Sequence, residues 1–86
     1  MTDAIENILN LVVKPRNPNV EKITVKEDDD SDVITYKIMV IVNKHEAIYD
    51  RGKPVKDIEN VLKSLGIGRR DIENIYFALN PSVYTE

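Results

Sequence analysis

The stretch "PVKDIENVLKSLG", residues 54–66, has the strongest helical pattern in the chain. Its apolar side chains recur every three or four residues and therefore share one face of an α-helix. That face consists of Val55, Ile58, Val61, Leu62 and Leu65. Pro54 is tolerated in a first helical turn, and Gly66 can adopt the left-handed conformation that ends many helices. We therefore predict an amphipathic helix between these two residues.

Segments with alternating polarity lie on both sides of this helix. After it, "IENIYFALN", residues 72–80, predicts a strand. Before it, "VEKITVKE", residues 20–27, and "VITYKIMVIVN", residues 33–43, predict two more, joined by an acidic turn at residues 28–32. The faces expected to be buried carry Ile23, Val25, Ile34, Tyr36, Ile38, Val40, Val42, Ile75, Phe77 and Leu79. The pattern favours a sheet with one buried face.

The remaining segments complete the expected order. Residues 3–12 predict a first amphipathic helix, with Asp3 as its N-cap and Glu6 as the second member of a capping box. Residues 14–19, "KPRNPN", should form a loop, residues 44–49 a single helical turn and residues 81–86 a loose tail. A chain of 86 residues supports one domain, so we expect residues 1–86 to form one unit.

The predicted fold class is α+β, because helices and strands are not arranged in repeated βαβ units. We expect a three-stranded sheet with helices on one face, in the order α-β-β-(α)-α-β. The face away from the helices would carry Met39 and Ile41, which are more apolar than a solvated face requires. Either a covered surface or scattered exposed apolar residues would account for them.

The composition of the chain argues against several classes of function. The chain has no cysteine, no apolar run long enough for a membrane span and no secretory signal, so we expect a cytoplasmic protein without a membrane partner. His45 has no second histidine nearby, and Asp28, Asp30 and Asp32 lack the glycine and glutamate of a calcium loop. We expect no enzyme activity, no cofactor and no metal site.

The segment "IYDRGKP", residues 48–54, lies in the only basic third of a chain whose net charge is −3. Gly52 precedes the predicted helix, whose free N–H groups attract anions. Arg51, Lys53 and Lys56 could surround a phosphate there. The same sequence is equally consistent with a turn that only starts the helix, with its basic side chains facing solvent.

The order of elements and the position of this loop resemble the type II KH domain over most of the chain. Under this resemblance Tyr49, Asp50, Arg51 and Gly52 occupy the four positions of the GxxG loop, with tyrosine in place of the first glycine. The resemblance implies binding of RNA or single-stranded nucleic acid, because that loop clamps a nucleic-acid backbone in the family.

Two functions follow as hypotheses. In the first, the chain binds RNA or single-stranded nucleic acid weakly through the loop from Tyr49 to Lys53. The expected contact residues are Ile48, Tyr49, Arg51, Gly52, Lys53, Val55, Lys56 and Ile58, with Ile48, Val55 and Ile58 beneath the bases. In the alternative, the fold serves as a protein-interaction or assembly subunit without nucleic-acid binding. It would then dock on a protein partner or a second copy through Met39, Ile41 and Tyr76, or through the edge strand at residues 20–26.

Overall fold

A computed structural model of the protein describes residues 2–29 and 32–82. The α-helices are α1 (Thr2–Val12) and α2 (Gly52–Ser64), and the strands are β1 (Val20–Asp28), β2 (Thr35–Val42) and β3 (Ile72–Leu79). Short 3-10 helices, η1 (Lys14–Arg16), η2 (His45–Ile48) and η3 (Arg69–Asp71), lie in the connections. The predicted order and the α+β class are confirmed.

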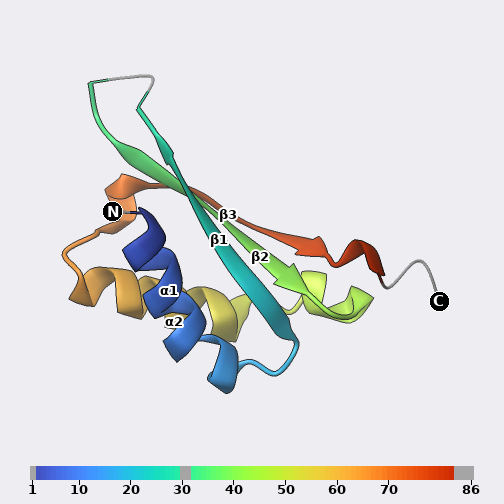
Figure 1. Ribbon diagram of the computed structural model, residues 1–86. Coiled ribbons are helices and arrows are strands. Elements are labelled where there is room, and N and C mark those ends of the chain that lie inside the picture. Colours follow the sequence, from blue (N-terminus) through green and yellow to red (C-terminus); the bar gives the residue numbers. More distant parts are fainter. Residues whose placement is uncertain (1, 30–31, 83–86) are drawn as a thin grey trace.

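The strands form one sheet in the order β1-β2-β3, with β1 antiparallel and β3 parallel to the central strand β2. Figure 1 shows α1 and α2 on the same side of this sheet, with the β1–β2 hairpin extending past the start of β3. The parallel pair β2–β3 needs a crossover, and η2 followed by α2 supplies it. One face of the sheet is therefore covered by helices.

The core lies between the helices and this covered face. Its fully buried large side chains are Leu9, Val13, Ile23, Ile38, Val40, Val42, Ile58 and Leu62. The register places Ile23, Val40 and Phe77 side by side across the three strands, as the alternation predicted. Ile34 is an exception. It precedes β2 and is exposed, because β2 begins two residues later than the sequence pattern suggested.

Side chains of α1 hold the outer edge of β1. Asn10 Nδ2 donates to the Ile23 carbonyl oxygen, and Ile23 N–H donates to Asn10 Oδ1, each at 2.9 Å. Val25 N–H donates to Glu6 Oε1 at 2.9 Å. The predicted capping box is wrong for Glu6, whose carboxylate binds a strand 19 residues away. Helix α1 also begins at Thr2, so Asp3 lies inside its first turn.

The end of α2 is a Schellman motif, as Gly66 suggested. Gly66 N–H donates to the Lys63 carbonyl at 3.0 Å, and Ile67 N–H donates to the Leu62 carbonyl at 2.9 Å. Gly66 has φ +81°, a conformation that favours glycine. Ile67 then packs against the core, which fixes the direction of the chain into η3.

Two predicted segments fall partly outside the described residues. The structure does not describe residues 30 and 31 of the acidic hairpin turn, nor residues 83–86 of the expected tail. Within the described ranges, no helix is long and apolar enough to cross a membrane.

Candidate protein-interaction surface

The uncovered face of the sheet carries aligned apolar side chains. Met39 lies opposite Tyr76 on β3, and the next pair along the same two strands is Ile41 opposite Ala78. On the β1 side, Thr24 lies opposite Met39. Tyr76 is 37% exposed, and the other four are half-buried by their neighbours in the sheet. We call these five residues the open-face patch. The predicted trio of Met39, Ile41 and Tyr76 therefore lies within one continuous surface.

Lysines flank the open-face patch along β1 and the hairpin. Lys22 lies opposite Ile41, and Lys26 lies opposite Lys37 in the row beyond Met39. Lys37 is paired with Asp28, with 3.8 Å between Nζ and Oδ2. The surface thus has an apolar centre and a polar border on one side, and an apolar core with a polar rim is common at protein contacts.

The sequence did not identify Thr24 and Ala78 as members of this surface. Ala78 is two residues from Tyr76, so strand alternation places both on the same face. Thr24 becomes a member only through the pairing of β1 with β2. That register depends on contacts between distant segments, which a single strand pattern does not specify.

In the loop expected to bind nucleic acid, the side chain of Arg51 makes contacts within the chain. Arg51 Nε donates to the Ile48 carbonyl oxygen at 2.6 Å, and the guanidinium carbon lies 5.3 Å from the centroid of the Phe77 ring. Tyr49 is 73% exposed, and its ring contacts that of His45 edge-on at 5.5 Å. Arg51 therefore stabilises the turn before α2.

Lys53 is also bound within the chain. Its Nζ donates to the Arg16 carbonyl oxygen at 2.6 Å and lies 3.2 Å from Asp57 Oδ2. Asn17, which is buried, donates from Nδ2 to the same carboxylate oxygen at 3.0 Å and to the Val13 carbonyl oxygen at 2.8 Å. These bonds tie η1 and the following residue to the first turns of α2.

The hydrogen bond from Asn17 is the main reason that the pKa of Asp57 is lowered from its ordinary value of 3.8. Desolvation opposes this shift, while the hydrogen bond and the charge of Lys53 add to it. The carboxylate is therefore held in its charged form by the fold.

The apolar residues expected beneath the bases belong largely to the core. Ile58 has no exposed surface, and Val55 and Ile48 are half-buried against the core cluster. The placement of Ile58 in a nucleic-acid interface is thus wrong, because its side chain faces the sheet. Gly52 and Lys56 remain exposed at the start of α2.

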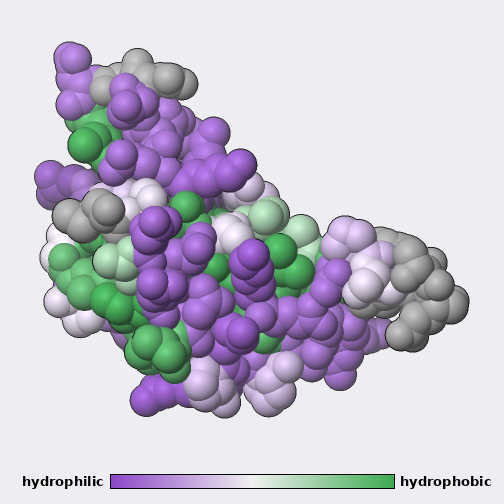
Figure 2. All heavy atoms as spheres, viewed as in Figure 1, coloured by the Kyte–Doolittle hydropathy of each residue, from purple (hydrophilic) through white to green (hydrophobic). Residues whose placement is uncertain are grey.

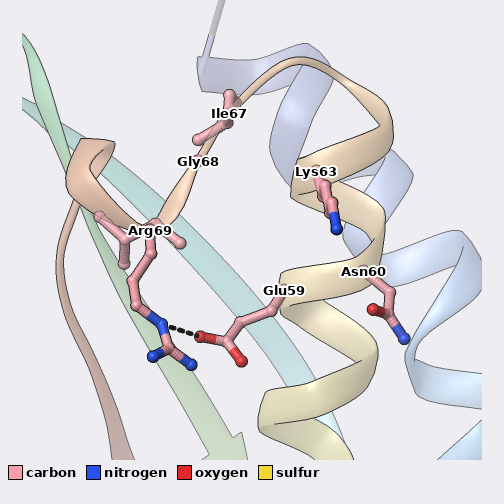
Figure 3. Close-up of a pocket in the computed structure, with 7 residues that line it drawn as sticks. Glu59, Asn60, Lys63, Ile67, Gly68 and Arg69 are labelled. Atoms are coloured by element: carbon pink, nitrogen blue, oxygen red, sulfur yellow. Dashed lines mark ion pairs between the residues drawn. The ribbon is translucent and has the colours of Figure 1, made fainter.

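A pocket lies at the other end of α2. It has a volume of about 360 Å³ and is open to solvent between α2 and the connection to β3. Figure 3 shows Glu59 extending from α2 towards Arg69, with which it forms an ion pair of 3.4 Å. Asn60 and Lys63 of α2 and Ile67 and Gly68 of the connection also line the pocket. Its charged side chains are exposed or paired with each other, which gives no organised ligand site.

A second exposed apolar region lies on the helical side. Figure 2 shows hydrophobic atoms gathered over the C-terminal parts of α1 and α2, whereas the hairpin arm is mostly hydrophilic and carries one small hydrophobic group. Exposed large apolar residues lie at the ends of these helices, namely Leu11 and Val12 in α1 and Leu65 directly after α2, and Leu11 is 74% exposed. Leu11 and the open-face patch lie on opposite sides of the sheet.

The outer edge of β1 is not free for docking. The backbone groups of Ile23 and the N–H of Val25 are bound by Asn10 and Glu6, as described above. The predicted docking through residues 20–26 would require these bonds to break, so this part of the alternative hypothesis is not favoured.

No group of three or more metal-binding side chains occurs in the described part of the chain. Asp30 lies outside that part. His45 is exposed.

Comparison with known proteins places the chain near one set of solved structures. No family model and no curated protein matches it. It resembles a MamM C-terminal domain in its manganese form, with 13% identity over 93% of this chain and 98% of that chain and a TM-score of 0.49. A MamM C-terminal domain in its cadmium form is similar, with 14% identity over 93% and 96% of the two chains and a TM-score of 0.47.

These comparisons correct the expected family. The structures found are MamM C-terminal domains and not KH domains, and no family model supports the KH resemblance, so that identification is wrong. At 13–14% identity and TM-scores of 0.47–0.49, these likenesses transfer no residue's role to this chain. Nucleic-acid binding therefore loses the resemblance on which it was based.

Proposed function

We propose that the chain is an assembly module in which two copies meet through the open-face patch. The observation that carries this proposal is the pairing of Met39 with Tyr76 and of Ile41 with Ala78 on a face that no described helix covers. The proposal assigns no catalytic activity to the chain. Of the two hypotheses from the sequence, protein interaction is therefore retained and nucleic-acid binding is not.

The apolar side chains give a physical reason for covering this face. Contiguous apolar side chains on an otherwise polar surface often mark a protein contact. Here Met39, Ile41 and Tyr76 lie on a sheet face that no described helix covers. A second sheet packed about 10 Å away would bury the patch at a spacing common between sheets.

The charges favour one arrangement of the two copies. A two-fold axis parallel to the strands places β1 of one copy over β3 of the other. Lys22 and Lys26 then approach the strand that carries Asn74, Tyr76 and Ala78, and a lysine ammonium is attracted to a tyrosine ring. An axis across the strands would instead bring Lys22 of one copy near Lys26 of the other, which repel.

Sedimentation velocity over a range of protein concentrations tests the proposal. The wild-type chain should shift from monomer towards a larger species as concentration rises. Met39→Asp should weaken this association by at least about tenfold, because a carboxylate would be buried in an apolar contact. Leu11→Asp is the matched control, since it adds the same charge at an exposed apolar residue on the opposite side. A wild-type chain that stays monomeric, or equal effects of both variants, would reject the proposal.

A further inference from the structure

The outer edge of β3 has unpaired backbone hydrogen-bonding groups. Asn80 N–H donates to the Val42 carbonyl at 2.9 Å, which places the amide of residue 80 on the side of β2. Because strand amides alternate in direction, the amides of Leu79, Phe77 and Ile75 point away from β2. Among the residues that the structure describes, none makes a hydrogen bond with these outward groups.

The two edges of the sheet differ in their hydrogen bonds with side chains. On β1, Asn10 binds the outward N–H and carbonyl oxygen of Ile23, and Glu6 accepts from the outward N–H of Val25. On β3, the corresponding positions in the register are Phe77 and Ile75, and their outward groups lack such side-chain partners in the described ranges. The chain therefore blocks one edge against strand pairing and leaves the other open.

The middle of β3 also lacks the features that usually protect an edge. Residues 75–79, "IYFAL", contain no charge and no proline. Glu73 and the register shift of the β2–β3 ladder lie before this segment, and Pro81 lies after it. Edge strands are commonly protected by lysine, proline or a bulge within the strand.

We propose that β3 pairs along this edge with β3 of a second copy, in the antiparallel direction, so that the two sheets become continuous. The occupant is another copy because the strand is complementary to itself. With the two-fold axis at Phe77, Ile75 lies opposite Leu79 of the other copy and Tyr76 lies opposite Ala78. Glu73 of one copy is then about eight residues along the strand from Glu73 of the other, or about 27 Å, so the carboxylates do not repel strongly.

This pairing would cover apolar surface that the helices leave open. On the covered face, Ile75 and Leu79 are only half-buried, whereas Ile23 and Val25 on β1 are buried beneath α1. Side chains of a neighbouring strand lie about 5 Å away and would shield both residues. The open-face patches of the two copies would also become neighbours, because paired residues of adjacent strands point to the same face.

Amide hydrogen exchange as a function of dilution tests the edge contact in the wild-type chain. The amides of Ile75, Phe77 and Leu79 should exchange quickly in dilute solution and slow by about tenfold once nine chains in ten are paired. Tyr76 and Ala78, whose amides face β2, serve as internal controls and should change little. Outward amides that exchange at one rate over all concentrations, while the mass increases, would overturn the proposal.

A pair of variants separates the backbone contact from side-chain packing. Leu79→Pro removes an outward N–H, and Leu79→Ala loses the side chain but keeps that N–H. The proposal expects the concentration-dependent protection of Ile75 and Phe77 to disappear in Leu79→Pro and to persist in Leu79→Ala. Protection that persists in a folded Leu79→Pro chain would contradict it.

The edge contact does not rest on the proposed face-to-face contact, since the two use different surfaces. Met39→Asp should therefore leave the protection of Phe77 unchanged even where it lowers the mass. Loss of that protection in a folded Met39→Asp chain would contradict the proposal that the edge contact forms independently of the open-face patch.

Discussion

The side chain of Asn10 makes two hydrogen bonds with the backbone of Ile23, accepting from its N–H and donating to its carbonyl oxygen, each at 2.9 Å. This relationship joins α1 to the outer edge of β1 and is the reason that this edge differs from that of β3. Helix α1 thus both covers the sheet and closes one of its sides.

Replacing Asn10 by alanine should destabilise the protein by about 1–3 kcal/mol, because both backbone groups of Ile23 lose their partner. Urea unfolding followed by circular dichroism measures this change. Asn60→Ala, at an exposed position of α2, is the control and should alter stability by less than about 0.5 kcal/mol. Equal stability of the two variants would show that the Asn10 bonds contribute little.

Asp57→Asn should make the free energy of unfolding less dependent on pH in the acidic range. The lowered pKa of Asp57 means that its contribution is complete above the ordinary value of 3.8 and is lost as pH falls through the lowered pKa. The variant should be less stable than wild type at neutral pH, and the difference should shrink in strong acid. Urea midpoints measured across this pH range test it.

Asp29→Asn is the matched control for that series, since Asp29 is exposed. It should change the free energy of unfolding by less than about 0.5 kcal/mol at neutral pH. A difference between Asp57→Asn and wild type that stays constant down to strong acid would contradict the role given to the Asn17 hydrogen bond.

Gly66→Ala should lower the free energy of unfolding by about 1 kcal/mol or more, because φ is +81° at this residue. Gly52→Ala is the control. A Cβ at Gly52 would meet nothing within 4 Å, and its φ is not positive, so stability should be unchanged or slightly higher. Thermal unfolding of both variants measures the difference, and equal destabilisation would argue against the Schellman motif as its cause.

Local patterns in the sequence predicted the elements of this fold. The helix capped by Gly66 and the alternation around Val40 and Phe77 depend on neighbours within a few residues, and the structure confirms both. Strand boundaries shifted by a residue or two, as at Ile34, because the end of a ladder depends on its partner strand.

The candidate site was harder to predict because its contacts join distant segments. Lys53 looked available for phosphate, yet it binds the Arg16 carbonyl, 37 residues away. Glu6 looked like a helix cap, yet it binds Val25. By contrast, Met39 and Ile41 were identified as unusual from the strand pattern alone, and that observation led to the open-face patch.

The central claim is that two copies meet through the open-face patch, and isotope-filtered NMR tests it most directly. A sample mixed from labelled and unlabelled chains reports only contacts between copies. The account predicts intermolecular cross-peaks from the methyl groups of Met39 and Ile41 to protons of the second copy. An associated sample whose intermolecular cross-peaks come only from helix residues such as Leu11 would contradict it.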